Sequence, residues 1–308
     1  MINKKLLEKI YRMSEKELKN FTKQTLQKTY ERVVCQDGFV FAQGTFPVLL
    51  VSHLDTVHKE CVKEIVYSDN GNVISSPQGI GGDDRNGVYS VLEIIKKFNC
   101  SVLFCEQEEI GGIGADKFAK SALASELEFN YIIEFDRANA NDAVFYQCAN
   151  DEFEAFITQD FYKTNYGSYS DICDVAPALG CAAVNLSCGY YKAHTTSEYV
   201  VLSEMEKSIE AACAILERTT ENDKFEYVEE LTPRSFNWRY MQEDDDDEYW
   251  ESKYYIIEYT SERGDTEWWD TVAFSKAEAI GKFVMECSSI PFDNVISVMS
   301  DANVSNYI

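Results

Sequence analysis

Short apolar runs alternate with amphipathic stretches over much of the chain. Four of the runs have the length and continuous apolar character of buried strands, at residues 47–53, 101–106, 129–136 and 181–189. Apolar positions recur at helical spacing in residues 85–98, 114–125 and 197–219, and Thr196 or Ser197 is the expected N-cap of the last stretch. Strands that alternate with helices predict an α/β fold, in which a mostly parallel, twisted sheet carries helices on both faces.

Further elements are expected around this framework. Residues 2–30 should be helical, with Ser14 and Glu17 at the spacing of a capping box. Asn70-Gly71 is a typical turn for a β-hairpin. Additional β segments are expected at 32–36, 38–44 and 143–159, and a short helix at 170–180.

The composition changes near residue 220. A polar stretch begins there and contains an acidic run at Glu243–Glu248, which is typical of a solvated loop. Beyond it the pattern predicts a hairpin turned at residues 263–265, a helix at 275–289 and a last strand at 294–300. We therefore expect a large domain at residues 1–221, an acidic linker at 222–250 and a small α+β (ββαβ) appendage at 251–308.

The composition excludes several classes of partner. Of the 308 residues, 45% are apolar, which suffices for a sizeable core. The 53 acidic and 28 basic residues give a formal net charge of −25, so we expect neither nucleic acid nor an anionic membrane surface as a partner. The charged N-terminus lacks the apolar core of a signal peptide, and no run of about 18 apolar residues occurs. The ten scattered cysteines form no CxxC pair and predict free thiols, so a cytoplasmic location is expected.

Histidines and carboxylates gather where the predicted strands end. His53 and Asp55 close the first buried run, and because residues i and i+2 of a strand share a face, both side chains point the same way. A metal-bound imidazole commonly donates its second ring N–H to a carboxylate, and HxD supplies such a pair. Comparable positions follow other predicted strands or open helices, namely Asp83, Asp84, Glu108, Glu109, Asp136 and His194.

Each of these signals is weak alone, because aspartates often cap helices and paired glutamates occur in solvated loops. Their combination is more specific. In a sheet covered on both faces, the ligand crevice lies beyond the carboxyl ends of the strands. Five ligands drawn from histidine and carboxylate suit two borderline metal ions such as zinc.

The same residues give the chain a resemblance to the co-catalytic di-zinc exopeptidases, the clan that includes bacterial leucyl aminopeptidases and tripeptidases. The resemblance covers about residues 31–217 and rests on "SHLDTV", "GGDDRNG", "EQEEIGGIGA", "EFD", "AHTTSEYV" and "YGSYSDICDVAPALGCAAVNL". His53 and Asp83 are 30 positions apart, and Asp136 and His194 are 58 apart, which leaves no room for an inserted lid domain. The chain therefore resembles the single-domain branch, with the phosphorylase/hydrolase-like zinc peptidase fold.

The resemblance implies two Zn²⁺ ions, for which Co²⁺ or Mn²⁺ could substitute, bound by five residues. Asp83 would bridge the two ions. His53 and Asp136 would complete one site, while Glu109 and His194 would complete the other. The peptide bond that follows Asp83 should be cis.

The resemblance also implies roles for two residues that hold no metal. Asp55 would orient His53, and Glu108 would act as general base toward a water shared by the two metals. A tyrosine among Tyr162, Tyr166 and Tyr169 could stabilise the oxyanion. His58 matches no ligand of the family and is expected to be an ordinary loop residue.

The leading expectation is an aminopeptidase acting on short peptides or small amides. A deacylase of N-acyl amino acids or a carboxypeptidase of the same clan stays open, because no residue identifies the substrate pocket. A peptide- or protein-binding pseudoenzyme is a third alternative, although such a module has no use for an unligated Glu108. The oligomeric state and the role of the appendage stay open as well.

Overall fold

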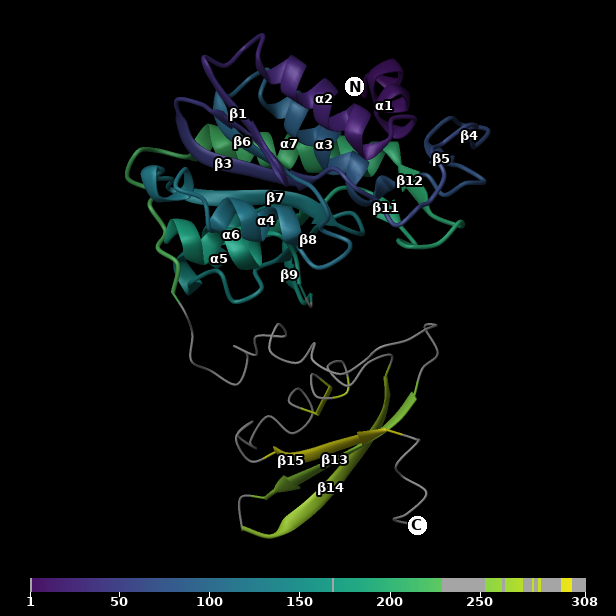
Figure 1. Cartoon of the computed structure of the whole chain (residues 1–308), viewed down its shortest axis with the longest axis vertical. Helices are drawn as coiled ribbons and strands as arrows, with labels where there is room; N and C mark the ends of the chain where they lie inside the picture. Colours follow the sequence, from purple (N-terminus) through teal and green to yellow (C-terminus); the bar gives the residue numbers. More distant parts are fainter. Residues whose placement is uncertain are drawn as a thin grey trace. The chain divides into compact units, whose positions relative to one another are not determined.

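The computed structural model describes residues 2–167, 169–228, 253–261, 264–273 and 295–300, together with Ala279, Lys282 and Phe283. The chain divides into two compact units, Met1–Val228 and Glu229–Ile308 (Figure 1).

The described part of the first unit alternates helices and strands. Its helices are α1 (Lys4–Tyr11), α2 (Glu15–Leu26), α3 (Gly82–Ile94), α4 (Ile113–Ala119), α5 (Asp151–Ile157), α6 (Ile172–Leu179) and α7 (Leu202–Arg218). Its strands are β1 (Arg32–Gln36), β2 (Phe39–Gln43), β3 (Phe46–His53), β4 (Val66–Tyr67), β5 (Val73–Ser75), β6 (Cys100–Cys105), β7 (Tyr131–Arg137), β8 (Asp142–Val144), β9 (Lys163–Asn165), β10 (Ala183–Ser187), β11 (Tyr190–Tyr191) and β12 (Tyr199–Val201). The capping box of Ser14 and Glu17 forms at the start of α2 as expected.

Eight strands form the main sheet in the order β1-β2-β6-β3-β7-β10-β8-β9. The four central strands β6, β3, β7 and β10 run parallel to one another, while β2 and β8 flank them in antiparallel pairing. The carboxyl ends of the four central strands therefore lie at one edge of the sheet. A second sheet, β11-β12-β5-β4, contains the hairpin expected at Asn70-Gly71.

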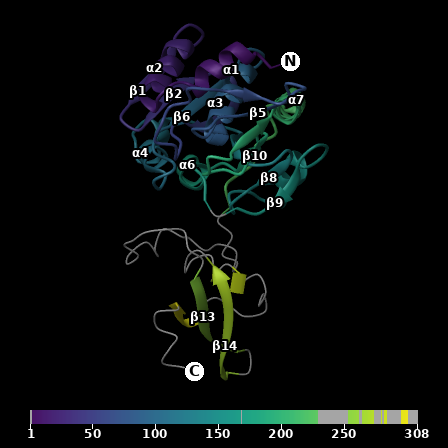
Figure 2. The same ribbon diagram turned by 90° about the vertical axis from the view of Figure 1, so that its right-hand side faces the viewer.

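Helices cover both faces of the main sheet, which confirms the expected α/β layering. The helices α1, α2, α3 and α7 lie on one face, and α4 and α6 lie on the other (Figures 1 and 2). Neighbouring residues of β3 enter opposite layers, because side chains alternate along a strand. Leu50 packs in the cluster that contains Val88 of α3, whereas Leu49 packs with Phe118 of α4 and Val175 of α6.

The prediction of a β segment at 143–159 is wrong for most of its length. Only β8 is extended there, and α5 follows. The aromatic residues of this stretch have a high strand propensity, but tertiary packing overrides it. The side chain of Asn150 accepts a hydrogen bond from the Phe153 amide and caps α5, and Phe153 and Ile157, four positions apart, both face the core.

The expected N-cap of the last long helix is also wrong. Helix α7 begins at Leu202 with Val201 as its N-cap, later than Thr196 or Ser197. The intervening residues 199–201 form β12, which pairs with β5 of the small sheet. A contact with a segment far away in sequence therefore delays the helix.

The first unit continues beyond residue 221. The Phe225 ring lies 5.0 Å from that of Phe153 and 5.1 Å from that of Phe156, measured between centroids. Its backbone N–H donates to the Asn130 carbonyl, and its carbonyl accepts from the Ala182 amide. The segment up to Val228 thus belongs to the core of the large unit and not to a linker. Residues 229–250, including the acidic run, lie outside the described residues.

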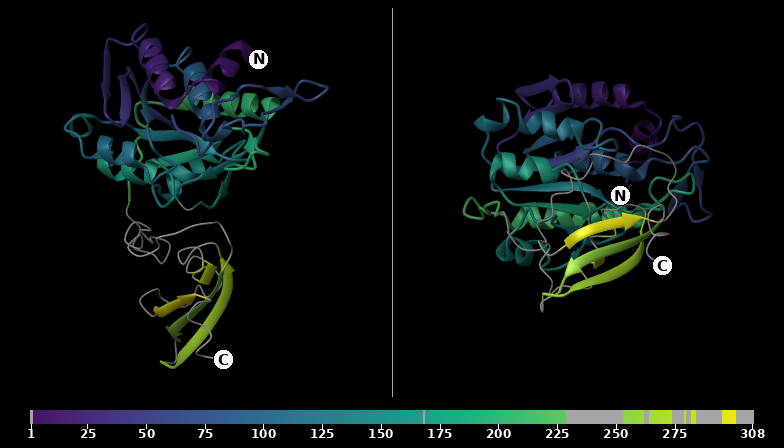
Figure 3. Two further views of the ribbon diagram at one scale, coloured as in Figure 1. Left: turned by 45° about the vertical axis from the view of Figure 1, so that its right-hand side comes forward. Right: turned by 60° about the horizontal axis from the view of Figure 1, so that its bottom comes forward.

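The second unit has a three-stranded antiparallel sheet among its described residues. The strands are β13 (Lys253–Thr260), β14 (Thr266–Ala273) and β15 (Val295–Ser300), in the order β14-β13-β15 (Figure 3). The hairpin turns at Gly264 as expected. Most of the helix expected at 275–289 lies outside the described residues, but Ala279, Lys282 and Phe283 are helical, and the Phe283 ring packs 4.8 Å from that of Tyr259.

Two further expectations can be compared with the described residues. All nine cysteines among them are free thiols. None of the helices they form is long and apolar enough to cross a membrane.

Candidate metal centre

The main sheet brings the expected site residues together at one edge. His53 is the last residue of β3, Asp136 lies near the end of β7, and Glu108 and Glu109 follow β6. His194 lies in the connection between β11 and β12. Four of these five residues therefore end or follow a parallel strand, where the ligand crevice of such folds lies, and His194 comes from the small sheet.

Asp83, at the start of α3, lies between the two histidines. Its Oδ1 is 3.1 Å from His53 Nε2, and its Oδ2 is 3.2 Å from His194 Nε2. Asp136 Oδ1 lies 3.3 Å from the same nitrogen of His53, and Glu109 Oε2 lies 3.0 Å from that of His194. The Nε2 atom of each histidine therefore faces two carboxylates, and Asp83 is common to both.

Hydrogen bonds alone satisfy this arrangement poorly, because one ring N–H has only one proton to donate. Neighbouring ligand atoms of a tetrahedral ion with bonds of about 2.0 Å lie about 3.3 Å apart, close to the separations observed. Glu109 Oε1 is buried and has no hydrogen-bond partner among the described residues. Within the described residues, His53, Asp83 and Glu109 form one of two groups whose ligand atoms lie near enough to hold an ion. The residues thus fit a divalent metal.

The pKa shifts describe a cluster rich in negative charge. Burial lowers the pKa of His53, but the surrounding carboxylates, Asp136 foremost, raise it well above its usual value. Hydrogen bonds with Asp83 and Glu109 raise the pKa of His194 to about 10. A site that draws protons onto its imidazoles also attracts cations.

Asp55 holds three groups beside this cluster. Its Oδ1 lies 3.2 Å from His53 Nδ1 and accepts the backbone N–H of Glu108 at 3.0 Å. Its Oδ2 accepts the backbone N–H of Glu109 at 3.1 Å. One carboxylate therefore fixes both the imidazole and the backbone from which the two glutamates diverge.

Glu108 and Glu109 occupy different places despite being adjacent. Glu109 reaches His194, whereas Glu108 Oε2 stays 4.0 Å from His53 Nε2, beyond hydrogen-bond distance. Burial raises the pKa of Glu108 to about 8, although the charge of His53 opposes the shift. A carboxyl group with a pKa near neutrality is suited to take up and return a proton.

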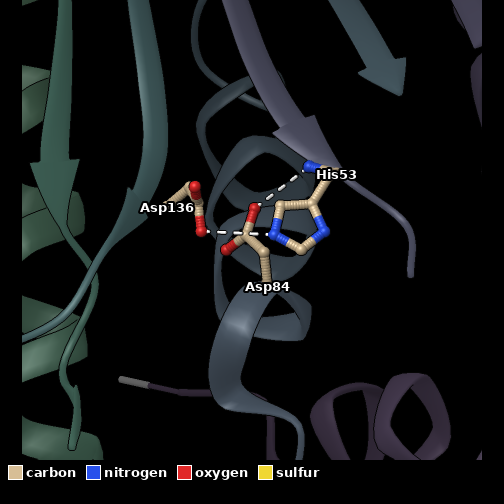
Figure 4. A group of neighbouring side chains, drawn as sticks. All are labelled: His53, Asp84 and Asp136. Carbon is tan, nitrogen blue, oxygen red and sulfur yellow. Dashed lines mark hydrogen bonds and ion pairs between the residues drawn. The ribbon is translucent and has the colours of Figure 1, made fainter. Parts of the chain in front are cut away.

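Asp84 lies beside the cluster with its oxygens engaged. Oδ2 accepts from Ser52 Oγ at 2.6 Å and from the His53 amide at 3.1 Å, and Oδ1 accepts from the Gly87 amide at 2.8 Å. Figure 4 shows Asp84 at the start of α3, with Asp136 on β7 across from it and His53 at the end of β3. Asp84 is near enough to His53 and Asp136 to share an ion, but its hydrogen bonds tie β3 to α3. The peptide bond between Asp83 and Asp84 is cis, as expected.

His58 does not join the cluster and lies in the loop after β3, as expected, but its side chain has a buried partner. Its Nε2 lies 2.8 Å from Glu198 Oε2. Glu198 is fully buried and also accepts the backbone N–H of Gly81 at 2.8 Å and that of Asp83 at 3.0 Å. Glu198 thus holds the backbone that presents Asp83. No pattern in the sequence indicates this role, because its partners Asp83 and His58 lie 115 and 140 positions away.

The expected oxyanion tyrosines have other surroundings. Tyr162 is buried and donates to the Ser208 carbonyl in the core, so it cannot serve. Tyr166 is 68% exposed. The hydroxyl of Tyr169 donates to Asp174 Oδ2 at 2.8 Å and lies against Gly112, in the loop that follows the two glutamates.

Comparisons with known proteins identify solved structures that share the fold. No protein-family model matches the sequence, and no curated protein matches it either. Solved structures do match. Aminopeptidase PepT from Bacillus cereus is 14% identical, and the match covers 69% of this chain and 96% of that one with a TM-score of 0.56.

Two further solved structures are similar to the same extent. A tripeptidase from Staphylococcus aureus is 14% identical, with 68% of this chain and 95% of that one covered and a TM-score of 0.54. Aminopeptidase APDkam598 from the archaeon Desulfurococcus kamchatkensis is also 14% identical, with 70% and 94% covered and a TM-score of 0.54. This chain has the fold of these aminopeptidases. The fold that the sequence resemblance implied is thereby confirmed.

Proposed function

We propose that the protein is a metal-dependent aminopeptidase that acts on short peptides. The observation that carries this proposal is Asp83, whose two carboxylate oxygens lie 3.1 Å from His53 and 3.2 Å from His194. A carboxylate shared between two histidine-containing groups suits a pair of metal ions. The similar folds of PepT, the tripeptidase and the archaeal aminopeptidase support a peptide as substrate.

Two divalent ions, zinc in the first instance, would share Asp83. His53 and Asp136 would hold one ion, and Glu109 and His194 would hold the other. When bound, the pair of ions polarises the scissile carbonyl and activates a water molecule.

Residues of the chain itself transfer the proton and position the ligands. Glu108 Oε2 accepts a proton from the attacking water and returns it to the leaving amine. Asp55 Oδ1 lies 3.2 Å from His53 Nδ1 and would accept the Nδ1–H, so that the lone pair of Nε2 points toward the cluster. Glu198 holds the backbone N–H of Asp83 and so fixes the shared carboxylate.

A substrate panel on the purified protein tests this function. The panel contains an aminoacyl reporter with a free α-amine, the same compound N-acetylated, and a reporter that releases a C-terminal residue. We expect turnover of the first compound only, with loss of turnover after chelation and recovery with added zinc. Turnover of only the N-acetylated or only the C-terminal reporter would replace the aminopeptidase by a deacylase or a carboxypeptidase.

A further inference from the structure

A cavity lies behind Asp55, beside the proposed metal centre. It has a volume of about 230 Å³, and its walls come from the start of α2, the loop after β3, the turn before α3 and the first turn of α3. Asp55 forms part of one wall, with both oxygens engaged by His53 and the glutamate amides. The volume is below the roughly 300–1,000 Å³ of sites for drug-sized ligands, so it suits a smaller molecule.

A buried cation lines this cavity without a hydrogen-bond partner. Arg85 is only 5% exposed, and its Nε and Nη1 are buried atoms that make no hydrogen bond with the described residues. A guanidinium stays protonated in proteins, so Arg85 carries a positive charge. Asp55 and Glu15 attract this charge, but neither is hydrogen-bonded to Nε or Nη1, and buried donors without an acceptor are costly. The planar guanidinium group can donate two parallel hydrogen bonds to one carboxylate.

An unpartnered acceptor lines the same cavity. Glu15 Oε1 is buried and receives no hydrogen bond from the described residues. The cavity thus offers an acidic oxygen and a guanidinium that attract each other but leave Glu15 Oε1 and Arg85 Nε and Nη1 without a hydrogen bond. A molecule that carries an ammonium group and a carboxylate satisfies both, whereas a simple anion or a simple cation satisfies only one. Met13, Val62 and Ile80 supply an apolar part of the wall.

We propose that this cavity binds a free α-amino acid with a small or apolar side chain, whose carboxylate pairs with Arg85 and whose ammonium group pairs with Glu15. Neither residue belongs to the metal-ligating cluster, so binding here does not depend on the proposed hydrolysis. Because Asp55 forms a wall of the cavity, the bound molecule lies next to the carboxylate that orients His53.

Isothermal titration calorimetry on the full-length, metal-loaded protein tests this site. The probes are L-alanine and L-leucine, and the matched compounds are N-acetyl-L-alanine, which has no ammonium group, and ethylamine, which has no carboxylate and no amide bond to be hydrolysed. We expect saturable binding of the two amino acids. Each matched compound should bind about 10- to 100-fold more weakly than L-alanine, because it loses one charge-assisted hydrogen bond.

Four variants locate the binding. Arg85→Gln and Glu15→Gln should each weaken L-alanine binding about 10- to 100-fold. Arg32→Gln is the matched control, because it removes a guanidinium that pairs with Glu126 on the surface, and it should leave binding unchanged. Asp83→Asn, which disturbs the metal cluster, should keep binding in the cavity. Should Arg85→Gln fail to fold, Glu15→Gln tests the same site.

Three results would overturn the proposal. The first is no saturable binding of either amino acid, which means that water alone fills the cavity. The second is binding that both cavity variants leave unchanged. The third is binding lost in Asp83→Asn but kept in Glu15→Gln, which places the amino acid at the metal cluster. This last result would leave the proposed hydrolysis intact.

Discussion

Changing Glu108 or Glu109 to glutamine should have different effects on turnover and metal binding, although the two residues are adjacent. Glu109 Oε2 lies 3.0 Å from His194 Nε2, whereas Glu108 Oε2 lies 4.0 Å from His53 Nε2 and contacts no imidazole directly. Glutamine keeps the shape and hydrogen bonding of glutamate but cannot accept a proton or supply a negative ligand. Glu108→Gln should therefore remove a base, and Glu109→Gln should remove a ligand.

The magnitude for Glu108→Gln follows from its role. A lost general base lowers turnover by about 10²–10⁴-fold, which corresponds to roughly 3–5 kcal/mol of activation free energy. Burial raises the pKa of Glu108 to about 8, so the protonated form is favoured at pH 7. Cations bound beside it favour the ionised form that accepts the proton. The variant should keep both metals.

Glu109→Gln should lose metal from the side that His194 serves. Even removal of a residue that only hydrogen-bonds to a ligand costs about 10- to 100-fold in metal affinity, and loss of a charged ligand should cost more. Added zinc should restore part of its turnover. His194→Ala should behave like Glu109→Gln, because His194 Nε2 lies 3.0 Å from Glu109 Oε2 and both residues would hold the same ion.

The assay is metal content and turnover measured side by side on the purified variants. Glu106→Gln is the matched control, since it removes a carboxylate two positions upstream that pairs with Lys19, and it should keep both metals and turnover. Loss of metal from Glu108→Gln together with its retention in Glu109→Gln would shift the assigned register by one residue. Unchanged turnover in both variants would refute a metallohydrolase.

Three other changes test the surroundings of the site. Glu198→Gln, whose amide can replace only one of the two accepting oxygens, should lower metal affinity about 10- to 100-fold, as equilibrium dialysis can measure. The thermal midpoint of the metal-free protein should fall as pH rises from about 5 to about 9. Folding raises the pKa of Glu108 to about 8 and that of His194 to about 10, so the folded state binds more protons than the unfolded state in this range. The metal-loaded protein should not show this fall. A chain ending after Val228 should stay soluble and keep its metal, whereas one ending at Thr220 should aggregate or melt earlier by calorimetry.

The main features of the site could be predicted from sequence because they are tied to strand ends. Continuous apolar runs identify the strands of a doubly covered sheet, and the geometry of such a sheet brings their carboxyl ends together. His53, Asp136 and the two glutamates follow from that rule. The resemblance supplied their separate roles, which no periodicity distinguishes.

The features that could not be predicted depend on contacts between distant segments. Glu198 reaches Asp83 only because β11 and β12 fold the chain back beside α3, and residue spacing carries no sign of that contact. Helix α7 starts late because β12 pairs with β5. Phe225 lies in a polar stretch of the sequence, yet its ring packs against that of Phe153 in the core. In each case tertiary packing decides the outcome.

The most direct test of the central claim is the metal content of the wild-type protein beside Asp83→Asn, with metal bound at saturation and counted by elemental analysis. The shared position of Asp83, 3.1 Å from His53 and 3.2 Å from His194, predicts two ions per wild-type chain and a loss that affects both in the variant. Circular dichroism should show that both proteins are folded. A folded wild-type protein that binds no divalent metal, or an Asp83→Asn variant that keeps both ions at wild-type affinity, would contradict the account.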